Sequence, residues 1–215
     1  MQATISNNEF HPVTRAAARI LSVILHPVFI PIYVLLFFLY LSPEAPALAP
    51  FDRLRITLSF SLMYIVFPVV TTLIAKGLGF IDSIMFRTSK DRIIPYVACG
   101  LFYFWMWYVL KNQPEFPKQL VAFSLGVFLA SSGGLIANSY LKVSMHTIAA
   151  GVACTFICLL GLKSDANFGF FITIAVLLTG LICTIRLINT DHNVREVYIG
   201  LAIGVMMEII AFWFV

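Results

Sequence analysis

The stretch FGFFITIAVLLTGLICTI, from Phe168 to Ile185, contains 18 residues and no charged side chain. A helix needs about 20 mostly apolar residues to cross the hydrocarbon core of a bilayer. Asn167 precedes the stretch and Arg186 follows it, and polar side chains of this kind belong at a membrane surface. We therefore interpret this stretch as a transmembrane helix.

Similar apolar runs occupy most of the remaining chain. The sequence predicts an all-α fold, a polytopic transmembrane helix bundle with about seven membrane helices. We expect one integral membrane domain over 1–215, in which 1–14 form a short polar N-terminal segment. Pro27 and Pro31 are expected to kink the first helix, and Pro68 the second. The other predicted spans are Ala16–Leu41, Leu54–Ala75, Ile93–Leu110, Leu120–Leu141, Thr147–Leu162 and Val197–Val215.

The composition excludes an ordinary soluble protein. Hydrophobic residues make up 60% of the chain and charged residues 11%, whereas a soluble domain has about 25% charged residues. The cations are scattered at the ends of the apolar runs, so we expect no nucleic-acid partner. We expect an integral protein of a membrane, and specifically of a bacterial inner (plasma) membrane.

Ionisable residues concentrate on one predicted membrane face. Seven crossings place the N-terminus and the connections after the second, fourth and sixth helices on the same side. Three segments that are distant in sequence would therefore meet at the mouth of the bundle. The positive-inside rule does not settle which compartment this face meets, because several of its cations are candidates for a site. The three clusters are Arg87, Lys90, Asp91 and Arg92; Lys142 and His146; and Arg186, Asp191, His192, Arg195 and Glu196.

The third cluster contains a histidine and a carboxylate at a spacing that would let the carboxylate orient the imidazole. His192 and Glu196 are four residues apart and would share a helical face if the last helix has already begun. A carboxylate beside an imidazole fixes its tautomer and raises its basicity. Arg186 lies six residues before His192, where its guanidinium could bind an anion.

The second cluster precedes an apolar helix. Ser144 is a suitable N-cap, and the N-terminus of a helix favours anions. His146 would lie in the first turn, and Lys142 adds a positive charge. Together with the cations of the first cluster, these residues suit phosphoryl transfer, which needs charge stabilisation, a nucleophile and an acid for the leaving oxygen. The carboxylates are too few and too separated for a magnesium site, so we expect no metal and no cofactor.

At these positions the sequence resembles the type-2 phosphatidic acid phosphatase family, which includes lipid phosphate and polyprenyl pyrophosphate phosphatases. Its signatures are K-x6-R-P, P-S-G-H and S-R-x5-H-x3-D. The third corresponds to Arg186, His192 and Glu196, with Glu in place of Asp and Ile185 in place of Ser. The second corresponds to 143–146, which keeps Ser144 and His146. The first is approximated by Lys90, Arg92 and Pro95 with different spacing.

The resemblance implies a role for each matched residue. His192 would be the nucleophile that forms a phosphohistidine, Glu196 would orient it, and His146 would protonate the leaving oxygen. A lipid phosphate or an isoprenoid pyrophosphate would be the substrate. The phosphate would be held by Arg186, Ser144, Lys90 and Arg92, to which we add Lys142 on charge alone.

Two other functions stay open. One is a non-catalytic relative that binds or moves lipid with the same pocket. The other is a small membrane transporter, in which Glu208, deep in the last apolar run, would form a coupling path with His26 and the basic residues. Gly200 and Gly204 lie one turn apart on that run and predict close packing against another helix.

Overall fold

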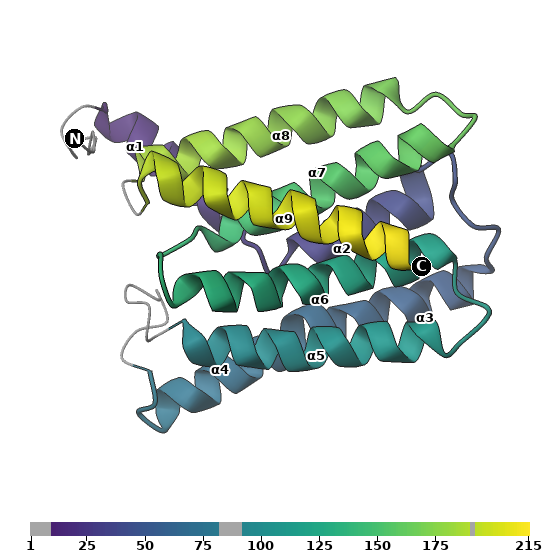
Figure 1. The fold of residues 1–215 in the computed structure, drawn as a ribbon, viewed down its shortest axis with the longest axis horizontal. Helices are drawn as coiled ribbons and strands as arrows, with labels where there is room; N and C mark the ends of the chain where they lie inside the picture. Colours follow the sequence, from purple (N-terminus) through teal and green to yellow (C-terminus); the bar gives the residue numbers. More distant parts are fainter. Residues whose placement is uncertain (1–9, 82–91, 190–191) are drawn as a thin grey trace.

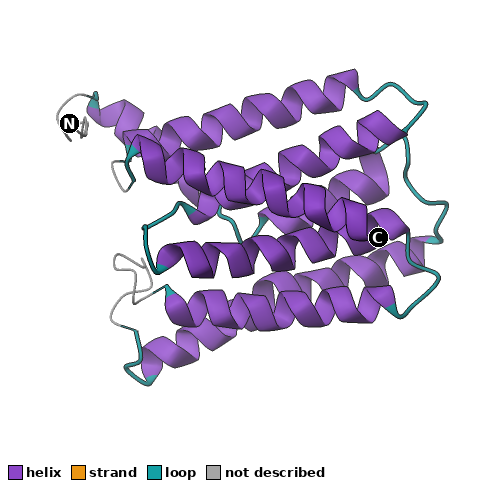
Figure 2. Ribbon diagram, viewed as in Figure 1, coloured by secondary structure: helices purple, strands orange, loops and turns teal. Residues whose placement is uncertain are grey.

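The computed structural model describes residues 10–81, 92–189 and 192–215, and every element in them is helical. Helices run roughly side by side along the longest axis of the molecule (Figures 1 and 2). The elements are α1 (Pro12–Ile24), α2 (Ile30–Leu36), η1 (Phe37–Leu41), α3 (Pro50–Ser61), η2 (Leu62–Val66), α4 (Phe67–Gly77), α5 (Ile93–Lys111), α6 (Lys118–Asn138), α7 (Met145–Lys163), α8 (Gly169–Ile188) and α9 (Val194–Phe214).

The predicted membrane helix bundle is confirmed. Within the described ranges, six helices are long and apolar enough to cross a membrane, and Ile30–Leu41 is a shorter apolar helix. The start of α1, the end of α4, the start of α5, the α6–α7 connection, the end of α8 and the start of α9 lie at one end of the bundle, on the left in Figure 1. The C-terminus and the connections η1–α3, α5–α6 and α7–α8 lie toward the opposite end. The described members of the three polar clusters therefore belong to segments that meet at the same end, whereas Arg87, Lys90, Asp91 and Asp191 lie outside the described residues.

The first predicted span is not one kinked helix. The structure ends α1 at Ile24 and begins α2 at Ile30, with turns between them. Pro27 lacks an N–H and disfavours helical geometry at His26, so the helical ladder cannot continue there. The Nδ1 atom of His26 instead accepts a hydrogen bond from the backbone N–H of Val28, 3.4 Å away.

The second predicted span contains Pro68 but remains helical on both sides of it. Helix continues from Pro50 to Gly77, and a π-helical turn, η2, lies directly before Pro68. A π-helical turn shifts the backbone hydrogen bonds by one residue, which accommodates the missing N–H of proline inside a continuous span. A π-helical turn thus lies next to Pro68, where a kink was predicted, inside a continuous helical span.

Helix α9 packs directly on α7 through glycines. A Cβ atom at Gly204 would lie 2.1 Å from the carbonyl oxygen of Ile148, and one at Gly151 would lie 2.6 Å from that of Leu201. A Cβ atom at Gly200 would lie 2.8 Å from the carbonyl oxygen of Ser144. No side chain fits between these backbones, so the close packing predicted for Gly200 and Gly204 is confirmed.

Glu208 continues the same helix into the core. Its side chain is 0% exposed, and its Oε2 atom would lie 1.7 Å from a Cβ atom at Gly126 of α6. The carboxyl group therefore occupies the space that a side chain at position 126 would fill. The N-terminal half of α9 therefore packs closely on α7, and Glu208, nearer its C-terminus, packs on α6.

The glycine contact gives the first prediction. Gly204→Ala places a methyl group against the backbone of α7, and overpacking of this kind costs roughly 1–3 kcal/mol. We expect a lower thermal midpoint of the detergent-solubilised protein, measured by the loss of its monodisperse size-exclusion peak after heating. Gly180→Ala is the matched control, because Gly180 is helical, exposed and has no atom within 4 Å of the added Cβ. Equal midpoints for both variants would contradict the close contact.

Candidate active site

The segment Lys142–Ser144, which joins α6 to α7, is held by three hydrogen bonds from two other parts of the chain. Arg92, at the start of α5, donates from Nη1 to the carbonyl oxygen of Val143 at 2.8 Å. His192 donates from Nδ1 to the carbonyl oxygen of Lys142 at 3.0 Å. The backbone N–H of Ser144 donates to the carbonyl oxygen of Glu196 at 3.2 Å. The starts of α5, α7 and α9 therefore meet at this segment.

The partners of His192 determine its tautomer. Its Nδ1 atom lies 3.0 Å from Oε2 of Glu196 as well as 3.0 Å from the carbonyl oxygen of Lys142. A carbonyl oxygen can only accept a hydrogen bond, so Nδ1 must carry the hydrogen. In the neutral ring, Nε2 then has the free lone pair that a nucleophile needs.

A capping box, not a shared helical face, brings Glu196 to His192. Helix α9 begins at Val194, after His192, so the two residues do not lie on one helical face as predicted. The backbone N–H of Glu196 donates to Oδ1 of Asn193 at 2.9 Å, and the N–H of Asn193 donates to Oε2 of Glu196 at 3.2 Å. This reciprocal pair turns the Glu196 carboxylate back past the helix start, where it also reaches His192.

His192 is neutral at physiological pH. Burial lowers its pKa from 6.5 to about 3, and the positive charges of Arg186, Arg92 and Lys142 act in the same direction. The side chain of His192 is only 1% exposed. A neutral imidazole with a free nitrogen is the form that can attack phosphorus.

His146 has the opposite tautomer. Its Nε2 atom lies 3.1 Å from the carbonyl oxygen of Ser22 and 3.3 Å from the Ser22 hydroxyl. Because the carbonyl oxygen only accepts, Nε2 carries the hydrogen. The ring also packs edge-on against His26, with 5.3 Å between the ring centroids. His146 therefore carries its N–H at the ring nitrogen that is unprotonated in His192.

Arg186 links α8 to the N-terminal helix. It lies in the last turn of α8 and is 7% exposed. Its Nη1 atom donates to the hydroxyl oxygen of Ser22 at 2.8 Å. Arg186 and His146, which are 40 positions apart in the sequence, thus both bind Ser22.

Ser144 has its predicted position but not its predicted capping bond. It is the N-cap of α7, and its hydroxyl makes no bond to the helix. Instead the hydroxyl of Thr147 donates to the carbonyl oxygen of Ser144 at 3.0 Å. The Ser144 side chain is 0% exposed, and its Oγ atom has no hydrogen-bond partner among the described residues. A buried hydroxyl without a partner is a hydrogen-bonding group that is available to a ligand.

The structure therefore gathers most of the predicted site residues at one end of the bundle. Lys90 lies outside the described residues. No group of three His, Cys, Asp or Glu side chains among the described residues is arranged to bind a metal ion. The predicted residues that share this end are Arg92, Lys142, Ser144, His146, Arg186, His192 and Glu196.

No protein-family model, no curated protein and no solved structure matches this chain. The resemblance of its short motifs to lipid phosphatases accordingly stays a prediction.

Sequence reasoning missed three residues of this site. Ser22 belongs to no motif, and nothing in the sequence of α1 marks it. His26 was assigned only to the coupling path of a transporter, whereas it packs on His146 of the candidate site. The role of Asn193 could have been found, since Asn followed three residues later by Glu before an apolar run is the pattern of a capping box.

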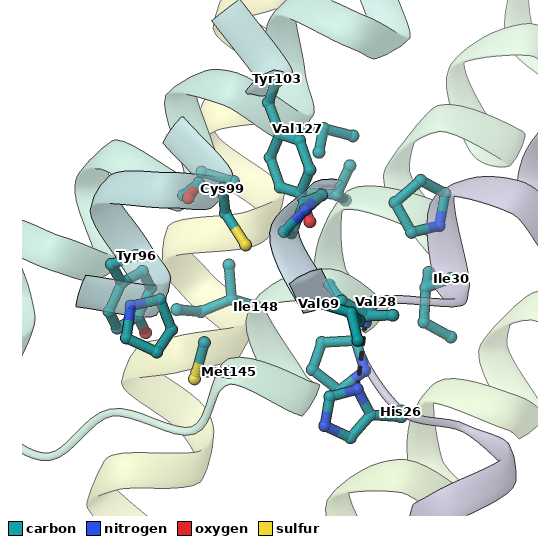
Figure 3. Close-up of a pocket in the computed structure, with 18 of the residues that line it drawn as sticks. His26, Val28, Ile30, Val69, Tyr96, Cys99, Tyr103, Val127, Met145 and Ile148 are labelled. Carbon is teal, nitrogen blue, oxygen red and sulfur yellow. Dashed lines mark hydrogen bonds between the residues drawn. The ribbon is translucent and has the colours of Figure 1, made fainter. Parts of the chain in front are cut away.

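An apolar cavity of about 270 Å³ lies beside the site (Figure 3). His26 and Met145 lie at one end of it, and Tyr103 and Val127 lie toward the other. Its wall on α4 includes Val69 and Leu73, which are 39% and 55% exposed. Further lining residues come from α2, α5, α6 and α7, among them Ile30, Pro31, Cys99, Phe123, Ala149 and Val152.

The arrangement of His192 gives the second prediction. Since its pKa in the folded protein is about 3, nitrogen NMR of histidine-labelled protein should show His192 neutral, with Nδ1 protonated, from pH 8 to pH 5. The unfolded imidazole binds a proton below about pH 6.5. The contribution of His192 to folding stability is therefore present above pH 6.5 and is lost as the pH falls from 6.5 toward 3. A His192 signal that titrates near pH 6.5 would show that the ring is not enclosed by these cations.

Proposed function

We propose that this protein is a membrane phosphatase that hydrolyses a lipid phosphate or an isoprenoid pyrophosphate through a phosphohistidine at His192. The observation that carries the proposal is the pair of opposite tautomers, a free Nε2 on His192 and a protonated Nε2 on His146. A displacement at phosphorus needs one nucleophile and one proton donor, and these two rings supply them.

The first step transfers the phosphoryl group to the protein. The Nε2 lone pair of His192 forms a bond to phosphorus while the bond from phosphorus to the lipid oxygen breaks. That oxygen takes a proton from Nε2 of His146, which enters the step as an imidazolium with hydrogens on both ring nitrogens, and leaves as an alcohol, or as a lipid monophosphate when the substrate is a pyrophosphate. Glu196 and the carbonyl oxygen of Lys142 hold the imidazolium that His192 becomes.

The second step restores the enzyme. Water attacks the phosphohistidine, the P–N bond breaks, and His146 takes the proton that the water loses. Inorganic phosphate leaves, and both histidines return to their starting forms. Arg186, Arg92 and Lys142 supply positive charge for the phosphate oxygens, and the same cations act on the pKa of His192.

The apolar cavity supports a lipid substrate. His26 lines the cavity and packs on His146, so a chain in the cavity would end near the proposed proton donor. The exposed side chains of Val69 and Leu73 place one wall of the cavity where bilayer lipid would lie. We propose that the hydrocarbon chain next to the phosphate occupies this cavity.

A lipid-binding protein without hydrolytic activity is the second candidate. Two observations favour it: the cavity itself, and the near-complete enclosure of the His192 side chain. Binding of lipid phosphates without phosphate release by the purified wild-type protein would support this candidate over the phosphatase.

The third prediction tests the histidine chemistry. His192→Ala should abolish phosphate release from a panel of phosphatidates and isoprenoid pyrophosphates, because it removes the imidazole that Glu196 orients as the nucleophile. Glu196→Gln should lower turnover by about 10²–10⁴-fold, since an amide orients the imidazole more weakly than a carboxylate. The measurement is inorganic phosphate released by purified protein in detergent.

His11→Ala is the matched control for this experiment, because His11 is exposed at the far end of α1. It should keep wild-type turnover. Wild-type turnover by His192→Ala, in a preparation free of contaminating phosphatase, would refute the mechanism.

The fourth prediction tests the cavity. Ala149→Trp should fill part of the cavity, so it should reduce kcat/KM for a long-chain lipid phosphate by about tenfold or more and spare a short, soluble phosphate ester. Ala202→Trp, on the exposed side of α9, is the matched control and should affect neither substrate. An equal loss with both substrates in Ala149→Trp would argue against a chain-binding cavity.

A further inference from the structure

Ser22 of α1 occupies a position between two side chains of the proposed site. Its hydroxyl oxygen accepts a hydrogen bond from Nη1 of Arg186 at 2.8 Å. Its carbonyl oxygen accepts one from Nε2 of His146 at 3.1 Å. In the mechanism above, both of these donors should face the substrate: Arg186 a phosphate oxygen, and His146 the leaving oxygen.

We propose that the two oxygens of Ser22 stand in for two oxygens of the substrate's phosphate, so that α1 must withdraw before a lipid phosphate can bind. The inference rests on the proposed function. The chemical class of the displacing ligand is a phosphate monoester or diphosphate attached to a hydrocarbon chain. Ser22 thus acts as an internal competitor of the substrate's head group.

The enclosure of the site supports this interpretation. Arg186 is 7% exposed and the side chain of His192 is 1% exposed, so a phosphate cannot reach them in this conformation without displacing protein. Among the described residues, Ser22 is hydrogen-bonded to both Arg186 and His146. Its removal would release the hydrogen bonds that Nη1 of Arg186 and Nε2 of His146 make to it.

Helix α1 can leave with little loss of packing. Ala18 is its one buried residue, and α1 packs chiefly against α8. The turns at 25–29 separate α1 from α2, so α1 can move without bending a continuous helix. The polar contacts that hold α1 in place are those at Ser22, a bond from Nδ2 of Asn189 to the carbonyl oxygen of Ala18 at 3.4 Å, and a bond from the Tyr33 hydroxyl to the carbonyl oxygen of Ile24 at 2.9 Å.

A membrane surface would receive the withdrawn helix. α1 exposes the apolar side chains of Val13, Ile20, Val23 and Ile24, each more than half exposed, and its sequence also contains Arg15 and Arg19. A helix with exposed apolar residues and cations binds at the interface of a bilayer that contains anionic lipid. The same bilayer supplies the anionic substrate, so a substrate-rich membrane would favour both the open position of α1 and occupation of the site.

Three substitutions at Ser22 separate a competitor from a substrate-binding residue. Ser22→Ala removes the hydroxyl that Arg186 binds, so inorganic phosphate should bind about two- to tenfold more tightly. Ser22→Asp places a carboxylate beside Arg186 and should weaken phosphate binding by about tenfold or more. Ser22→Asn is the neutral control of matched size for Asp and should lie close to wild type. Binding is measured by calorimetry on purified protein, and turnover of a lipid phosphate should follow the same order.

Hydrogen exchange of the wild-type protein gives a measurement that needs no variant. Amides of 18–25 should exchange faster when vanadate or phosphate is added, because α1 is released. Slower exchange on adding phosphate, or weaker binding in Ser22→Ala, would mean that Ser22 helps to hold the ligand, and would overturn the proposal.

The outcomes distinguish this proposal from the function on which it rests. Hydrolysis at equal rates by all Ser22 variants would leave the phosphatase standing and overturn the role of α1. Tighter phosphate binding by Ser22→Ala, without hydrolysis by any variant or by the wild-type protein, would support the role of α1 and contradict the proposed phosphatase activity. Failure of every variant to bind phosphate would overturn both.

Discussion

The contact of α9 with the backbone of α7 is the constraint on which the site depends. Three glycines, Gly151, Gly200 and Gly204, remove the side chains that would separate the two helices. Because the helices touch, the N–H of Ser144 reaches the carbonyl oxygen of Glu196, and the segment before α7 lies against the start of α9. His192 can then bind the carbonyl oxygen of Lys142, which fixes its tautomer. The tautomer proposed for the His192 imidazole thus depends on the close packing of α7 and α9 that the three glycines allow.

The ends of the membrane helices were largely predictable, because bilayer thickness imposes a length on each apolar run. Predicted and observed boundaries of α5 to α9 differ by only a few residues. The break in the first span was harder to predict, since two prolines in an apolar run can bend a helix or end it. Which occurs depends on whether a neighbour satisfies the freed backbone groups, and here the ring of His26 does so.

The sequence predicted which residues form most of the candidate site, but it did not predict the hydrogen bonds among them. Counting crossings placed Arg186, His192 and Glu196 at the same end as Ser144 and His146, and the structure places these residues there. The spacing of His192 and Glu196 suggested a helical face, whereas a capping box makes the contact. Ser22 could not be predicted, because its partners are 124 and 164 positions away and a serine in a helix has no distinctive pattern.

The shortness of the helix Ile30–Leu41 has a consequence for the membrane itself. Its 12 residues span about 18 Å, against about 30 Å for the hydrocarbon core. The helix alone does not cross the core, and the irregular backbone at 25–29 that precedes it lies beside the cavity that His26, Pro27 and Val28 line. Non-helical backbone at membrane depth is tolerated where it lines such a cavity. A span shorter than the hydrocarbon core is matched by a thinner bilayer beside it. Thinning on this flank would bring lipid head groups closer to His26 and His146.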